Sequence, residues 1–127
     1  MSESVEAKTE VEGRRLGKVE VSLDAVATIA GRAALQCYGV VGMSSSRLRD
    51  DIAEVLQQEN YRRGVKVHSR DSNITIDLYV VVEYGTRISE VGRNIMSTVK
   101  FTVEKALGLP VAQVNVNVQG LRISDKQ

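Results

Sequence analysis

The 127-residue sequence is poor in aromatic residues: it has no tryptophan, one phenylalanine and four tyrosines. Its core must therefore consist mainly of valine, isoleucine, leucine and alanine, and few rings are left to stack on bases or sugars. Neither sign of charge dominates, because seventeen basic residues face sixteen acidic ones. This balance argues against nucleic-acid binding that is driven by bulk charge.

Cysteine and long apolar runs are equally scarce. The single cysteine, Cys37, cannot form an internal disulfide, which fits a reducing compartment. No apolar run approaches the ~20 residues of a membrane-spanning helix. The first residues also lack the basic and apolar regions of a signal peptide. We therefore expect a soluble, cytoplasmic protein that consists of one domain.

Catalytic and metal-binding chemistry has few candidates in this sequence. The only histidine, His68, is expected at an exposed position of a strand, and no nucleophile motif surrounds any serine or Cys37. Cys37 falls on the apolar face of an expected helix, where a buried and unreactive thiol is predicted. Asp50, Asp51 and Glu54 come nearest to a carboxylate cluster, but such a run on a polar helix is typical of a solvated surface. We predict no catalytic, metal or cofactor site.

Hydrophobic periodicity predicts alternating strands and helices. Alternation of apolar and polar residues indicates strands, and recurrence at three and four residues indicates helices. We expect strands at 17–22, within 38–46, and at 64–69, 73–85 and 114–120, and helices at 23–37, 47–60 and 88–108. Ser22 and Ser89 are the expected N-caps of the two long helices, and Gly108 is the expected stop of the last one. The polar helix at 47–60 is expected at an edge or in an insertion.

The order of these elements, β-α-β-(α)-β-β-α-β, predicts an α+β fold. Since β-α-β crossovers are right-handed, both long helices should cover the same face of a mixed sheet. The result is a two-layer sandwich with one bare sheet face. We assign residues 14–121 to this single domain, residues 1–13 to a disordered acidic tail and residues 122–127 to a frayed C-terminus.

The bare face of the sheet is the candidate binding surface. Asn115, Asn117 and Gln119 should point to it, an unusual choice because asparagine packs poorly on a pleated sheet. Tyr79 and Val81 are the only sizeable apolar residues expected on the same face. Tyrosine favours the centre of protein interfaces, so these five residues are a candidate contact surface for a protein partner. A plain solvated sheet surface with two harmless apolar residues explains them as well.

Two other patterns suggest anionic ligands. Gly39 and Gly42 bracket a GVVG stretch that matches the bare GXXG loop of a KH domain, which binds single-stranded nucleic acid, and Arg47 follows it. The loop itself holds no basic residue, so nucleic-acid binding is our alternative and not our preference. The basic segment 62–70, RRGVKVHSR, could contact an anionic partner or lipid headgroups, but protection of an outer strand explains it more simply.

Several stretches together resemble the alkaline shock protein family of Gram-positive bacteria, the Gls-type proteins of the envelope stress response, formerly classed as a domain of unknown function. These stretches are GVVGMS after an alanine-rich helix, IDLYVVVEYG before a helix, and the closing VNVNVQG. The resemblance covers residues 17–121 and implies a non-enzymatic protein of cell-envelope homeostasis.

Family members are thought to act through protein partners and to gather at the inner face of the cell membrane through a membrane-anchored partner. The resemblance thus implies an adaptor or scaffold without a cofactor, and it supplies no catalytic residues. Self-association is compatible with this role, whereas insertion into the membrane and nucleic-acid binding are not expected.

Overall fold

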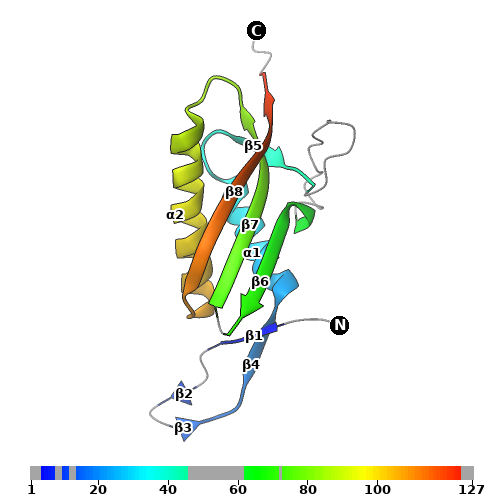
Figure 1. Cartoon of the computed structure of the whole chain (residues 1–127). Coiled ribbons are helices and arrows are strands. Elements are labelled where there is room, and N and C mark those ends of the chain that lie inside the picture. The colour runs from blue at the N-terminus through cyan, green and yellow to red at the C-terminus, as the bar shows by residue number, and fades with distance from the viewer. Residues whose placement is uncertain (1–3, 8–9, 12–13, 46–61, 72, 124–127) are drawn as a thin grey trace.

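A four-stranded sheet under two helices forms the centre of the computed structural model, which describes residues 4–7, 10–11, 14–45, 62–71 and 73–123. The strands are β5 (Val40–Met43), β6 (Val65–Arg70), β7 (Asn73–Glu83) and β8 (Val111–Arg122), and the helices are α1 (Leu23–Leu35) and α2 (Ile88–Leu107). Both helices lie on the same face of the sheet (Figure 1). The predicted α+β class and its two-layer arrangement are therefore confirmed. The helix expected at 47–60 lies outside the described residues.

β7 is the central strand of the sheet, and it uses both of its edges. Along one edge it pairs in parallel with β8, from Ile74 to Glu83. Along the other edge it pairs antiparallel first with β6 and then with β5. β5 and β6 therefore lie end to end and occupy one strand position, which the chain leaves after β5 and re-enters at Val65.

The junction of β5 and β6 is closed by Gly64. A Cβ atom at this position would lie 2.5 Å from the carbonyl oxygen of Ser44 and 3.0 Å from the Cβ of Met43. Only glycine allows the two strand ends to approach so closely. The Ser44 N–H also donates to the carbonyl of Tyr79 at 2.8 Å, which continues the β5–β7 ladder toward β6.

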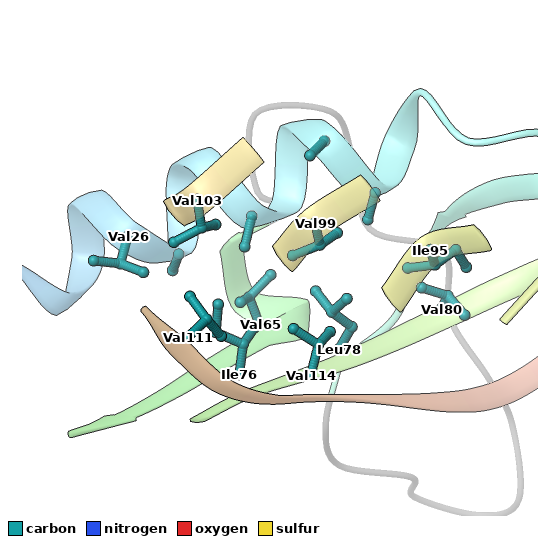
Figure 2. Close-up of a cluster of buried hydrophobic side chains, with 14 of the residues drawn as sticks. Val26, Val65, Ile76, Leu78, Val80, Ile95, Val99, Val103, Val111 and Val114 are labelled. Atoms are coloured by element: carbon teal, nitrogen blue, oxygen red, sulfur yellow. The ribbon is translucent and has the colours of Figure 1, made fainter. Parts of the chain in front are cut away.

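The core lies between the sheet and the helices (Figure 2). One face of β7 carries five residues with no exposed surface: Ile74, Ile76, Leu78, Val80 and Val82. α2 contributes a buried stripe at intervals of four residues: Val91, Ile95, Val99, Val103 and Leu107. α1 adds Val26 and a set of buried alanines, whose small side chains let the helix lie close to its neighbours. The predicted aliphatic core is therefore confirmed.

The helix ends follow the predicted signals only in part. Ser22 caps α1, since its Oγ accepts a hydrogen bond from the Ala25 N–H at 3.1 Å. Gly108 ends α2 in the left-handed conformation with φ of 73°, as predicted. The N-cap of α2, however, is Arg87, which makes no side-chain capping bond. The prediction of Ser89 as a cap was wrong, because the extended backbone that an N-cap needs occurs two residues earlier.

The N-terminal segment is more ordered than predicted. β1 (Ser4–Ala7) pairs antiparallel with β4 (Val19–Ser22), and β2 (Glu10–Val11) pairs with β3 (Arg14–Arg15). The expected strand at 17–22 thus exists as β4, but it lies outside the main sheet. The prediction of disorder was wrong for β1, because pairing with β4 satisfies its backbone and lets Val5, which is 7% exposed, join the core. At the other end of the chain, β8 runs on to Arg122 instead of fraying there.

Candidate interaction surface on the open face of the sheet

The face of the sheet that points away from the helices is called the open face below. Because side chains alternate along a strand, the residues between the buried positions of β7 point to it. It is formed by Thr75, Asp77 and Tyr79 of β7, Lys66, His68 and Arg70 of β6, and Gln113, Asn115 and Asn117 of β8. All nine are half-buried or exposed. The sheet thus has one core face and one accessible face, as predicted.

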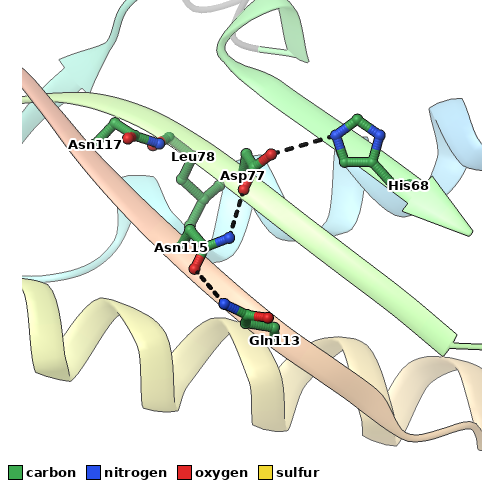
Figure 3. A network of polar contacts seen from close by, with 6 residues as sticks. All are labelled: His68, Asp77, Leu78, Gln113, Asn115 and Asn117. Atoms are coloured by element: carbon green, nitrogen blue, oxygen red, sulfur yellow. Dashed lines mark hydrogen bonds and ion pairs between the residues drawn. The ribbon is translucent and has the colours of Figure 1, made fainter.

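A chain of polar contacts crosses the open face from β6 to β8 (Figure 3). The Asn115 Nδ2 donates to Asp77 Oδ1 at 2.7 Å, and the Gln113 Nε2 donates to Asn115 Oδ1 at 3.0 Å. On the other side of β7, His68 Nε2 lies 3.3 Å from Asp77 Oδ2. Asp77 therefore joins all three strands. These contacts hold the side-chain amides of Gln113 and Asn115 in place.

Asn117 is held in a different way, by the main chain of β7. Its Nδ2 donates to the carbonyl oxygen of Leu78 at 3.2 Å, next to its ladder partner Tyr79. Gln119 falls at an irregularity of the ladder: Val118 pairs with Val80, and Gly120 pairs with Val81. Gln119 is therefore the additional residue of a bulge and has no partner in β7. Of the three amides singled out in the sequence, two lie in a regular row and the third lies beyond its end.

Val81 is not available for contacts, in contrast to the prediction. Its exposed fraction is 3%, whereas Tyr79 is half-buried. Val81 lies in the central strand at the point where the partner strands on both edges, at Gly42 and Gly120, are irregular. Strand alternation shows to which face a residue points, but it does not show whether that residue is accessible there. Tyr79 is therefore the apolar part of the open face.

The GXXG stretch does not form a binding loop. Gly39 has φ of 89° and makes the turn after α1, but Gly42 is buried within β5, opposite Val81. The main chain from Val40 to Met43 is thus part of the sheet, whereas a KH domain needs these residues in an accessible loop. The KH alternative is therefore wrong. Arg47 lies outside the described residues.

The basic segment 62–70 runs along an outer position of the sheet. Arg62, Arg63, Lys66 and Arg70 are all exposed, and β6 pairs only with β7 among the described strands. The expected outer strand is confirmed. That its cations serve to protect this edge stays a prediction.

The titratable groups form no further cluster in the described part of the chain. Cys37 is 7% exposed, as predicted, its Sγ lies 3.5 Å from the Ala33 carbonyl oxygen, and burial raises the pKa of its thiol. Among the described residues, no group of three or more His, Cys, Asp or Glu side chains is placed to hold a metal ion. The central place of Asp77 on the open face could not be predicted from the sequence, because its neighbours Asn115 and His68 are known only once the strand register is known.

The described helices include none with the length and apolar character needed to span a bilayer. Residues 11–123 match the model of the alkaline shock protein 23 family, which is described as having a cell envelope-related function. The chain is 42% identical to the uncharacterized protein YloU of Bacillus subtilis over 123 residues, 96% of this chain and 98% of that protein. It is 45% identical to the uncharacterized protein Spy1614 of Streptococcus pyogenes over 108 residues, 84% of this chain and 89% of that protein.

More distant similarities are found as well. A stress response regulator gls24 homolog of Streptococcus pyogenes is 26% identical over 98 residues, which are 77% of this chain and 55% of that protein. A solved variant of the MamM CTD aligns with a TM-score of 0.48 at 12% identity, over 82% of this chain and 88% of that one. The extent of the family match decides the assignment: the chain belongs to the alkaline shock protein 23 family, whose function is related to the cell envelope.

Proposed function

We propose that the chain is a non-enzymatic adaptor of the cell envelope, which binds a protein partner through the open face. One observation carries this proposal: the contacts of Asp77 and of the Leu78 carbonyl hold Asn115 and Asn117 in fixed positions beside Tyr79. Ordered amides and a half-buried ring lose little conformational freedom on binding, which lowers the entropic cost of complex formation.

The chemistry of the open face indicates the kind of partner. Its middle, formed by Tyr79, Asn115 and Asn117 around the hydrogen-bonded carboxylate of Asp77, carries hydrogen-bonding groups and a single negative charge. Its β6 side carries the exposed cations Lys66 and Arg70. Such a surface fits a protein whose contact region has amide or main-chain groups at its centre and acidic residues on one side.

We further propose that this partner is anchored in the membrane and brings the adaptor to its inner face. The cell envelope-related function of the family supports this step. The name of the gls24 homolog, a stress response regulator, supports a role in the envelope stress response. The open face, and not a lipid-binding segment, is the element that we expect to make the contact.

The test compares two double variants of the full chain in the native host. Thr75→Lys with Tyr79→Ala removes the ring and adds a charge on the open face. Asn94→Lys with Phe101→Ala makes the matched change on α2, where both residues are exposed. We expect the wild type and the α2 variant to co-purify with the same protein from detergent-solubilised membranes, and the open-face variant to lose it. Unchanged capture by a correctly folded open-face variant contradicts the proposal.

Protein-free vesicles made from the lipids of the host separate a protein anchor from the bilayer itself. We expect the wild-type chain to remain in the supernatant when such vesicles are sedimented. It should sediment with native membranes that retain their proteins. Binding to the protein-free vesicles would contradict recruitment by an anchored partner.

A further inference from the structure

The outer edge of β8 is long and unusually unprotected. Within the described part of the chain, β8 pairs only with β7, so its other edge faces outward along a strand of 12 residues. No charged residue and no proline occurs from Ala112 to Leu121. Natural edge strands usually carry lysine, proline or other devices against unwanted pairing. The opposite edge strand, β6, shows this pattern with Lys66 and Arg70, whereas β8 has only two irregularities, at Ala112 near its start and at Gln119.

The strand register shows which main-chain groups of β8 point outward. The Tyr79 carbonyl accepts a hydrogen bond from Ser44, so the main-chain groups of the next residue, Leu78, face β8. In a parallel ladder a residue bonds to the two neighbours of its partner. Leu78 pairs with Val116, so the N–H and C=O groups of Val116 point away from β7.

The same alternation turns the main-chain groups of Val114 and Val118 outward. These amides have no acceptor within the described part of the chain. They are therefore available to a strand that adds to the sheet.

Val111 is the first outward-facing residue of β8, and its main-chain groups already have hydrogen-bond partners. Its N–H donates to Glu104 Oε2 at 2.8 Å, and Lys100 Nζ donates to its carbonyl oxygen at 2.6 Å. Lys100 and Glu104 also pair with each other at 3.3 Å, one turn apart on α2. These two side chains close the sheet edge at the start of β8. The open part of the edge therefore begins after Val111.

The flank of the sheet beside this edge is incompletely covered. Val116 and Val118 are half-buried, although their partners Leu78 and Val80 have no exposed surface. α2 extends to the side beyond β8 in Figure 1. Met96, one turn before Lys100 on the flank of α2 that reaches β8, is 41% exposed. A strand added next to β8 would cover these apolar groups and lie against α2.

We propose that this strand is β8 of a second copy, paired antiparallel about a two-fold axis. The segment VNVNV from 114 to 118 has the same pattern in both directions. An axis at Val116 therefore sets Val114 opposite Val118 of the second copy on the helix side of the sheet. It sets Asn115 opposite Asn117 of the second copy on the open face, as an isologous interface requires. The two sheets join into one.

Sedimentation velocity of the full chain over a range of concentrations tests this interface. We expect a species of twice the 13.9 kDa chain mass. Val118→Lys places a charge on the covered side of the new ladder, and Val116→Pro removes an outward N–H without removing a bond to β7. Both variants should lose the dimer. The matched control is Val67→Lys, since Val67 is a half-buried valine on the helix side of the other edge strand. It should keep the dimer.

Amide hydrogen exchange gives a second readout at the same positions. In the wild type, the amides of Val114, Val116 and Val118 should exchange slowly at high concentration and quickly on dilution. In Val118→Lys they should exchange quickly at every concentration. If Val116→Pro does not fold, Val118→Lys and the exchange data carry the test.

Three results would overturn the inference. A wild-type chain that is monomeric at all concentrations, with fast exchange at these amides, excludes it. A dimer that survives both edge variants but is lost in Thr75→Lys with Tyr79→Ala places the contact on the open face. Protection of the β8 edge only when a foreign peptide is bound assigns the edge to another partner. The proposed function does not require the β8 edge. A Val118→Lys chain that is monomeric and still captures the anchored protein would therefore support both proposals independently, and failure of the dimer would leave the proposed function intact.

Discussion

Two glycine-to-alanine substitutions test the interrupted edge strand, because the same chemical change should have opposite effects. At Gly64 the new methyl group would lie 2.5 Å from the Ser44 carbonyl oxygen, 3.0 Å from the Met43 Cβ and 3.2 Å from the Tyr79 carbonyl oxygen. Two of these atoms are main-chain atoms of strands that are paired with each other, so the contact can be relieved only by separating the strands. Overpacking of this kind costs about 2–3 kcal/mol.

Gly92 provides the matched control. It lies within α2, and a Cβ atom there would meet nothing within 4 Å. Alanine should therefore stabilise the helix by about 1 kcal/mol. The two variants should differ by about 3–4 kcal/mol in the free energy of unfolding. At about 4 °C per kcal/mol for a chain of this size, Gly64→Ala should melt roughly 10 °C below the wild type and Gly92→Ala roughly 4 °C above it.

Urea unfolding followed by circular dichroism measures both differences at one temperature. The denaturant slope should be the same in all three proteins, since neither change alters the surface that unfolding exposes. A Gly64→Ala protein as stable as the wild type would refute the close approach of residue 64 to Ser44. The end-to-end placement of β5 and β6 would then be wrong as well.

Three further predictions concern the caps, the closed start of β8 and the buried thiol. Ser22→Ala should lower the free energy of unfolding by about 1 kcal/mol. Ser89→Ala should change it by less than about 0.5 kcal/mol, because Ser89 is not an N-cap. Equal losses of stability in urea unfolding would contradict the assigned caps. The hydrogen bond from the Val111 N–H, and then the contact with Lys100, hold the pKa of Glu104 below its usual 4.5. Ionised Glu104 therefore stabilises the fold above pH 4.5, and this contribution is lost as the pH falls through the lowered pKa. Glu104→Gln should thus destabilise the fold at pH 7 and differ less from the wild type in acid, and a pH-independent difference would argue against the contact. Burial raises the pKa of Cys37, so iodoacetamide should alkylate this thiol slowly in the native protein and quickly in urea; fast native alkylation would show that it is accessible.

The elements that the sequence predicted best are long and strictly periodic. β7 alternates from Asn73 to Val80, and all five of its helix-side residues are fully buried. α2 repeats an apolar residue every four positions from Val91 to Val103, as predicted. In both elements the period alone identifies the buried face. The shared face of the two helices was also predicted, but the handedness of crossovers explains only α2, which connects the parallel strands β7 and β8, since β4 before α1 lies outside the main sheet.

The features that the sequence missed depend on contacts between distant segments. β1 holds too few apolar residues to indicate a strand, and it becomes one by pairing with β4. Alternation placed Val81 between core-facing neighbours, but it does not show that the assembled sheet leaves this residue only 3% exposed. Asn115 could be assigned to the open face from its period, but its hydrogen bond to Asp77 depends on the β7–β8 register. Local periodicity determines faces, whereas register and coverage are properties of the assembled sheet.

β8 has a part in both proposals, and its two alternating sets of residues keep the two roles apart. Its asparagines belong to the open face and face the proposed partner, while its valines direct their main-chain groups to the free edge. Two copies joined along β8 would place their open faces side by side on one continuous surface. Two linked sites that engage two anchored partners in one membrane bind much more tightly than either site alone, because the second contact forms within the same complex. A single-copy adaptor would need a stronger contact surface than Tyr79 and two amides provide. The weak chemistry of the open face and the unprotected edge of β8 therefore support each other.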